Sequence, residues 1–108
     1  DKGGAPGNYL ESSGTSMFAY AMAKGANKGY LPKKFKTIAA KAFDGLTSKL
    51  IKVDPNGAIT ITNACAVAGL GGTPYRDGSY EYYINERKKD NDPKATGPFI
   101  LAALELNR

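Results

Sequence analysis

The stretch SSGTSMFAYAMAKG, residues 12–25, is the clearest indication of how the chain folds. Residues 17–23 are apolar without a polar break, so a helix here would be apolar most of the way round and would need burial on more than one side. The Glu-Ser-Ser-Gly segment at its start is typical of a helix N-terminus, because a serine oxygen can accept a backbone N–H of the first turn. Glycine and proline residues follow, and the pattern predicts a helix over residues 13–28.

The segment KKFKTIAAKAFDGLTSKL, residues 33–50, has a different pattern. Its apolar residues recur at spacings of three and four and lysines fill many positions between them, which predicts an amphipathic helix with one buried stripe. Gly45 inside it costs about 1 kcal/mol relative to alanine, which indicates that something packs closely there. A second nearly all-apolar run, residues 99–104, follows a Gly-Pro helix start and predicts a last helix over residues 96–106.

The region between the second and the last helix carries a small β excursion. DPNG, residues 54–57, is a strong turn signal, and AITIT, residues 58–62, alternates and is β-branched, which predicts a short strand. Residues 64–67 could be its partner. Glycines then open a long irregular stretch, and residues 80–84 fit either a strand or a helix.

Together these elements predict a mainly α chain with a small β-hairpin excursion. Two of the predicted helices need burial on most sides, and the single amphipathic helix cannot cover both of them. The chain alone would therefore expose a large apolar face. Helical toroids have this layout, with an inner ring of buried helices and an outer ring of half-exposed ones. Pairing within an oligomer would satisfy it equally.

Composition excludes several classes of active site. The 108 residues include no histidine and one cysteine, Cys65, so a Ser-His-Asp triad, a Cys-His dyad and a typical zinc site cannot be built from this chain alone. No metal and no cofactor is expected. Because no apolar stretch approaches the roughly 20 residues needed to cross a bilayer, no membrane partner is expected either. The net charge of +5 admits an anionic partner without naming one.

Four stretches carry a resemblance to a known family. They are ESSGTSMFAYAMAKG (residues 11–25), CAVAGLGG (65–72), PYRDGSYEYY (74–83) and NDPKATGPF (91–99). In this order they resemble the unsaturated rhamnogalacturonyl hydrolases, glycoside hydrolase family 105, over nearly the whole chain. The related unsaturated glucuronyl hydrolases of family 88, which act on glycosaminoglycan fragments, fit these residues as well.

The resemblance implies a six-hairpin (α/α)6 toroid, with residues 1–108 as a single region from the C-terminal part of a larger domain. In the family an aspartate protonates the C4–C5 double bond of an unsaturated uronic acid and activates water, and the resulting hemiketal falls apart. That aspartate lies upstream in the family, so no catalytic residue is expected in this chain. The expected partner is an oligosaccharide with an unsaturated uronic acid end, in the bacterial cytoplasm or the periplasm, and not a nucleic acid.

The loop of residues 75–80 is the best candidate for a substrate contact. The rings of Tyr75 and Tyr80 could stack on sugar faces, and the guanidinium of Arg76 could pair with a uronate carboxylate. Asp77 belongs to the same candidate site. The alternative is that Arg76 and Asp77 form a structural ion pair in a loop.

Ser12 and Ser13 have two interpretations. The resemblance places the ends of the inner helices at the cleft, where serine hydroxyls and helix N–H groups would suit an anionic substrate. The alternative is a plain helix cap. The carboxylates of Glu11, Glu81 and Glu86 are interpreted as structural, because nothing in their spacing pairs them for glycoside hydrolysis.

A second hypothesis comes from a different class of protein. The chain could be a small basic binding module that uses its lysines and tyrosines to hold an anionic glycan or nucleic acid. It is the weaker hypothesis, since the lysines and the tyrosines fall in different segments. If the chain is a fragment of a larger enzyme, its exposed apolar face could also drive self-association.

Overall fold

The computed structural model describes residues 2–108, and Asp1 lies outside them. The mainly α prediction is confirmed, because most of the regular structure is helical. In order, the elements are α1 (Ser12–Asn27), α2 (Lys34–Lys49), β1 (Ile51–Val53), β2 (Ile59–Ile61), β3 (Ala64–Cys65), α3 (Tyr80–Asn85), β4 (Lys88–Lys89) and α4 (Pro93–Leu106).

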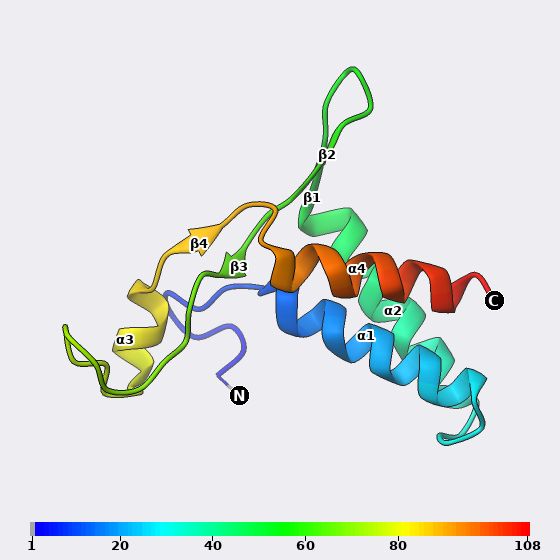
Figure 1. The fold of residues 1–108 in the computed structure, drawn as a ribbon, viewed down its shortest axis with the longest axis horizontal. Coiled ribbons are helices and arrows are strands. Elements are labelled where there is room, and N and C mark those ends of the chain that lie inside the picture. The colour runs from blue at the N-terminus through cyan, green and yellow to red at the C-terminus, as the bar shows by residue number, and fades with distance from the viewer. Residues whose placement is uncertain (1) are drawn as a thin grey trace.

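Three helices form one layered unit in which α1 contacts both α2 and α4. Figure 1 shows α1 and α4 running in the same direction and α2 running against them. Small side chains make the contacts, since Ala19, Ala23, Ala39 and Ala102 are fully buried and let the helix axes approach closely. This is the arrangement expected for part of an α/α toroid, in which the sequence predicts α1 and α4 as inner helices and α2 as an outer one.

The last helix begins three residues earlier than the sequence predicts. The carboxylate of Asp92 accepts the backbone N–H of Lys94 at 2.9 Å and caps α4, and Pro93 occupies the first turn, where a missing N–H costs nothing. Asn91 joins this start to the hairpin, because its N–H donates to the Ile61 carbonyl and its side chain accepts the Ile61 N–H, each at 2.8 Å.

The predicted strand is confirmed as β2, but its predicted partner is wrong. β2 pairs antiparallel with β1 across the 54–57 turn, where Gly57 has a φ of +86°. Ala64 and Cys65 form β3, which pairs instead with β4. Asn63 has a positive φ of 61° and turns the chain out of the first hairpin, so residues 64–67 cannot fold back on β2.

Lys88 and Lys89 form β4, a short exposed strand that pairs with β3. One further expectation needs correction. A Cβ added at Gly45 would meet nothing within 4 Å, so nothing in this part of the chain packs closely there. Gly45 instead lies in an open groove of about 230 Å³ between α2 and the start of α1.

Large apolar side chains remain exposed on the two inner helices, as the sequence predicts. They are Met17 and Phe18 on α1 and Ile100, Leu101 and Leu104 on α4. Phe18 is 70% exposed and Leu104 is 58% exposed, so these faces have no partner within residues 2–108. Over the same residues, no helix has both the length and the apolar character that a membrane span needs.

Candidate functional site

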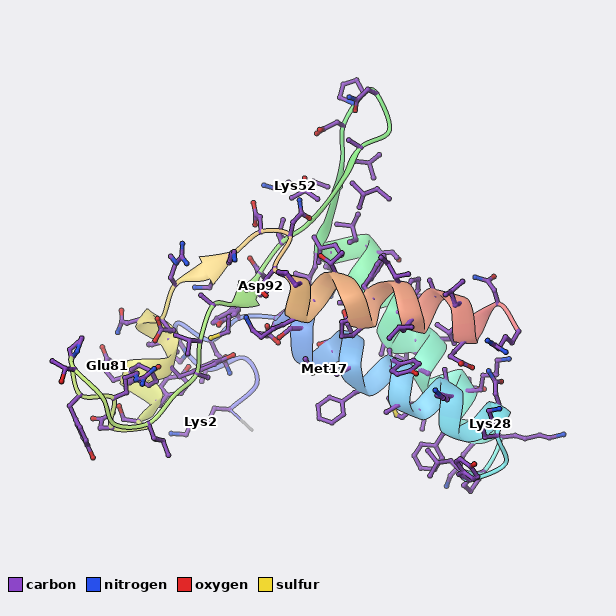
Figure 2. All side chains as sticks on the ribbon, in the orientation of Figure 1. Lys2, Met17, Lys28, Lys52, Glu81 and Asp92 are labelled. Atoms are coloured by element: carbon purple, nitrogen blue, oxygen red, sulfur yellow. The ribbon has the colours of Figure 1, made fainter. Side chains whose placement is uncertain are left out.

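The candidate site residues of the 75–80 loop lie in a lobe beside the helical layer (Figure 1). This lobe, here called the α3 lobe, consists of residues 2–11 and 64–91. The pairing of β3 with β4 closes its base, through Ala64 opposite Lys89 and Cys65 opposite Lys88. Figure 2 places Lys2 and Glu81 in the lobe, well away from Lys28 at the far end of α1.

Arg76 stabilises the loop that precedes α3. Its backbone exchanges two hydrogen bonds with Gly71, and its Nε donates to the Gly71 carbonyl at 3.0 Å. The guanidinium then lies against the loop's own backbone, so a Cβ at Gly69 or Gly72 would come within 2.5 or 2.9 Å of its Nη atoms. Two glycines are therefore required for Arg76 to fold back in this way.

The structural ion pair between Arg76 and Asp77 is not formed. Within residues 2–108 the ion pairs join Lys94 to Asp92 and Arg108 to Glu105. Asp77 instead accepts the backbone N–H of Ser79 at 2.9 Å. The hydroxyl and the N–H of Ser79 together hold the pKa of the Asp77 carboxyl below its ordinary value. Asp77 is thus an exposed, ionised acceptor at neutral pH.

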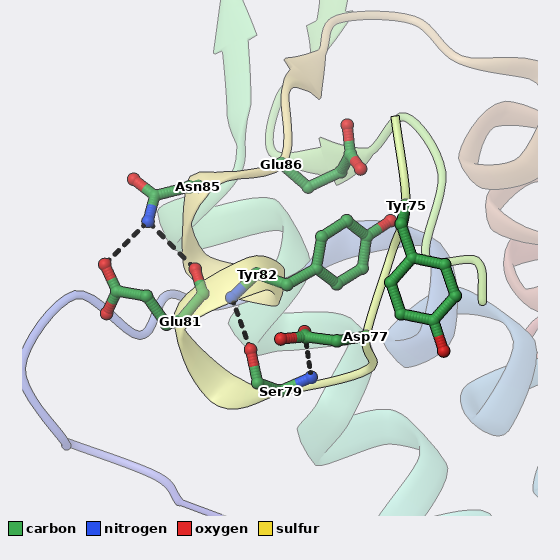
Figure 3. Close-up of a pocket in the computed structure, with 7 residues that line it drawn as sticks. All are labelled: Tyr75, Asp77, Ser79, Glu81, Tyr82, Asn85 and Glu86. Carbon is green, nitrogen blue, oxygen red and sulfur yellow. Dashed lines mark hydrogen bonds between the residues drawn. The ribbon is translucent and has the colours of Figure 1, made fainter. Parts of the chain in front are cut away.

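One face of α3 borders an acidic hollow, here called the Glu81 cavity, of about 340 Å³. Figure 3 shows the residues that line it, which are Tyr75, Asp77, Ser79, Glu81, Tyr82, Asn85 and Glu86. Asn85 donates to Glu81 at 3.0 Å, and the Tyr82 hydroxyl beside Glu86 lowers the pKa of that carboxyl. Carboxylates and tyrosine rings around one hollow suit the hydroxyl groups and the apolar face of a neutral sugar.

Tyr80 lies on the opposite face of the same helix. The helical period turns Tyr80 and Tyr83 away from Glu81 and Tyr82. The Tyr80 hydroxyl donates to the Pro6 carbonyl at 2.7 Å, and Tyr83 stacks on Tyr9 with ring centroids 5.5 Å apart. Tyr75 and Tyr80 therefore border different hollows, although they are five positions apart in the sequence.

Ser12 and Ser13 lie at the buried start of α1, where Glu11 performs the capping. The Glu11 carboxylate accepts the N–H of Ser13 at 3.1 Å, the N–H of Gly14 at 2.7 Å and the Ser13 hydroxyl at 2.7 Å. The expectation that a serine oxygen caps this helix is wrong, because the longer Glu11 side chain reaches the same N–H groups with a full charge. The Ser12 hydroxyl is fully buried and has no hydrogen-bond partner in residues 2–108.

Electrostatics agree with this arrangement. Burial raises the pKa of Glu11, but the hydrogen bonds from Gly14, Ser13 and Cys65 outweigh it, so the net pKa is lower than the ordinary value. The Glu11 carboxylate thus already occupies the helix end at which an anionic substrate was the alternative. Cys65 is buried, as its apolar surroundings in the sequence predict. In the described part of the chain, no three acidic or cysteine side chains gather closely enough for a metal ion.

Comparison with known proteins now decides the family, because residues 1–108 match the profile of glycosyl hydrolase family 88 from end to end. The chain belongs to glycosyl hydrolase family 88. Protein Atu3128 of Agrobacterium fabrum (strain C58) and the 24.9 kDa protein in the picA locus of Rhizobium radiobacter are each 36% identical to it over 111 residues. Each match covers 97% of this chain and 48% of the relative, so the chain spans about half the length of these curated proteins.

A solved structure shows that the chain is also similar to a member of family 105. The glycoside hydrolase of family 105 from C. acetobutylicum ATCC 824 is 48% identical and superposes with a TM-score of 0.94. The match covers 99% of this chain and 30% of that one. The resemblance drawn from the four sequence stretches is thereby confirmed, and so is the placing of α1, α2 and α4 in part of an α/α toroid.

The structure distributes the predicted site residues of this family 88 chain over four places. Tyr75 and Asp77 meet in the Glu81 cavity, Tyr80 faces the N-terminal segment, and Ser12 and Ser13 lie at the start of α1. Arg76 is half-buried behind the loop. Their roles as substrate contacts stay predictions.

Sequence reasoning missed other residues that line the Glu81 cavity and the hollow on the opposite face of α3. Glu81 and Glu86 were interpreted as structural, and Lys2, Tyr9 and Tyr83 were not singled out. The available signal was the density of tyrosines around position 80. It could not be used without knowing that the segment is helical, because the helical period decides which side chains share a face.

Proposed function

We propose that this chain is part of a glycoside hydrolase that removes unsaturated uronic acid residues from oligosaccharides during polysaccharide breakdown. The activity is of the unsaturated rhamnogalacturonyl or glucuronyl type, and pectin fragments are the substrates we favour. The observation that carries the proposal is the 48% identity and TM-score of 0.94 to the family 105 hydrolase. The match to family 88 over the full chain supports the same class of reaction.

In the proposed reaction this chain forms part of the substrate-binding cleft and does not provide the general acid. The resemblance assigns protonation of the double bond at C4 to an aspartate outside these 108 residues, after which water adds at C5 to give a hemiketal. The hemiketal opens to a ketone at C5, and the hemiacetal that this leaves at C1 releases the neutral sugar. The residues described here would bind and orient the sugar. A positioned substrate converts an encounter into an effectively intramolecular reaction, so residues without proton chemistry can still contribute to the rate.

We assign Tyr75 and Asp77, which line the Glu81 cavity, to the neutral sugar of the substrate and Arg76 to the uronate carboxylate. Ser12 and Ser13, which are buried beside the Glu11 carboxylate, and Tyr80, on the opposite face of α3, are left out of this assignment. The exposed ring of Tyr75 can pack against an apolar sugar face, and the exposed Asp77 carboxylate can accept hydrogen bonds from sugar hydroxyls. The Nη groups of Arg76 form no hydrogen bond within residues 2–108, which leaves them able to receive a carboxylate.

The test uses a protein that joins these residues to the rest of an α/α toroid. It is incubated with an unsaturated rhamnogalacturonan disaccharide, and loss of the ultraviolet absorbance of the double bond is followed. We expect steady loss of absorbance and release of the neutral sugar. Release of sugars from a saturated uronide, with the unsaturated substrate left intact, would contradict the proposal.

A further inference from the structure

The two faces of α3 border hollows of opposite charge. The Glu81 cavity on one face is lined by Asp77, Glu81 and Glu86 and by no lysine or arginine. On the other face lie two adjoining hollows of about 320 and 430 Å³, which share Lys2, Tyr80 and Tyr83 among the residues that line them. These two hollows, here called the Lys2 cleft, are lined by no carboxylate of residues 2–108. Their size is within the range of small-ligand sites.

The Lys2 cleft is held in shape by contacts between the N-terminal segment and α3. The Tyr80 hydroxyl donates to the Pro6 carbonyl at 2.7 Å, and the Lys2 ammonium lies 4.9 Å from the centroid of the Tyr80 ring. Gly7 has a φ of +81°, and a Cβ there would come within 2.7 Å of the Ile84 side chain. The segment therefore lies directly against the helix, so the cleft is formed before any ligand arrives.

The Lys2 ammonium has no acidic partner in the described part of the chain. Neither of the ion pairs formed within residues 2–108 includes it. It lies over the Tyr80 ring, and a second ammonium, that of Lys88, lies 4.2 Å from the ring centroid of Tyr9, which lines the same cleft. Positive charge over tyrosine rings suits a ligand that has both an apolar face and a negative group.

We propose that the Lys2 cleft binds a sugar that carries a carboxylate. Its carboxylate pairs with the Lys2 ammonium, and its ring lies against Tyr80 and Tyr83. The inference rests on the proposed function only in taking the ligand to be a saccharide, and it adds a position for a second acidic sugar beyond the unsaturated one that reacts. The acidic Glu81 cavity would repel the same ligand, so the two faces of α3 distinguish acidic from neutral sugars.

The experiment titrates a complete enzyme that contains these 108 residues with digalacturonate and with its neutral counterpart, galactobiose, at low salt. Binding is followed by calorimetry. Lys2→Gln removes the charge in the cleft, and Lys28→Gln removes an equal charge at the far end of α1. We expect Lys2→Gln to weaken digalacturonate binding about tenfold, as for the loss of one charged hydrogen bond, and Lys28→Gln to leave it unchanged.

Three outcomes would overturn the inference. Equal weakening by Lys2→Gln and Lys28→Gln would show that only net charge matters. Equal affinity for galactobiose would show that the carboxylate is not recognised, and full competition by inorganic phosphate would show a simple anion site. Hydrolysis does not enter this readout, so loss of acidic-sugar binding alongside an active complete enzyme would refute this inference alone. Binding alongside an inactive complete enzyme would refute only the proposed function.

Discussion

The carboxylate of Glu11 accepts the backbone N–H of Cys65 at 2.9 Å, with the same oxygen that caps α1. One side chain thereby joins the start of α1 to the last residue of β3, fifty-four positions later in the chain. Because β3 closes the base of the α3 lobe, Glu11 helps to hold that lobe on the helices, together with the Lys94 ammonium that donates to the Ala66 carbonyl at 3.0 Å. A residue interpreted from sequence as structural is thus a link between the two parts of the molecule.

Replacement of Glu11 tests that link. Glu11→Ala removes the cap of α1 and leaves the Cys65 N–H without an acceptor, so we expect a loss of about 2 kcal/mol in the free energy of unfolding. Urea denaturation followed by circular dichroism measures it. Glu81→Ala, an exposed carboxylate on α3, is the matched control and should change stability by less than about 0.5 kcal/mol. Equal effects of the two variants would refute the linking role.

The pH dependence of stability follows from the same residue. The pKa of Glu11 in the folded chain lies below its ordinary value of 4.5, so its contribution is complete above that pH. It is lost as the pH falls through the folded-state pKa, because the protonated carboxyl no longer accepts these hydrogen bonds. Thermal unfolding between pH 7 and pH 3 should therefore show a smaller fall in Tm for Glu11→Gln than for the parent chain. Parallel curves for the two proteins would contradict the assignment.

Replacement of Arg76 tests whether this residue contacts the substrate or only supports its loop. In the complete enzyme we expect Arg76→Ala to raise KM for an unsaturated disaccharide more than it lowers stability, because the free Nη groups are available to a carboxylate. KM, kcat and Tm are measured on the same preparations. If Tm collapses while the kinetics of the surviving protein are unchanged, Arg76 only supports the loop through Gly69, Gly71 and Gly72.

The 108-residue chain by itself should not hydrolyse unsaturated uronides. The carboxylates of Glu11 and Asp77 are held by the backbone N–H groups of Cys65 and Ser79, which leaves them ionised acceptors rather than proton donors. The assay is loss of the ultraviolet absorbance of an unsaturated disaccharide over hours. Turnover at a rate comparable to a full-length relative, in a preparation free of contaminating enzyme, would mean that Glu11, Asp77 or Glu81 is the acid.

Self-association is expected for the isolated chain. Phe18 on α1 and Leu104 on α4 are mostly exposed, and apolar faces of this kind associate in water. Sedimentation should show a mass that rises with concentration, and Phe18→Ser with Leu104→Ser should restore the monomer. Val53→Ser, which removes an exposed apolar side chain from the protruding hairpin, serves as control and should leave the association intact.

The sequence by itself determined the three long helices and the family. Residues 17–23 and 99–104 are apolar on almost every side, and residues 33–50 have one apolar stripe, so two buried helices and one half-exposed helix follow from pattern alone. The four motif stretches identified families 105 and 88 for a similar reason, since each is a local run of letters. Local signals of this kind can be recognised in the sequence without any knowledge of contacts between distant segments.

Only the tertiary structure decided the cap of α1, the partner of β3 and the two faces of α3. Serine and glutamate can both cap a helix, and the choice of Glu11 depends on the Cys65 N–H that the fold brings beside it. The strand at 64–65 pairs with Lys88 and Lys89 because the loop between them folds back around Arg76. A six-residue helix rich in tyrosine is too short to be stable alone, so α3 depends on its packing against Gly7 and Tyr9. Each of these outcomes rests on contacts between distant segments, whose free energy exceeds the small local preferences that a sequence pattern expresses.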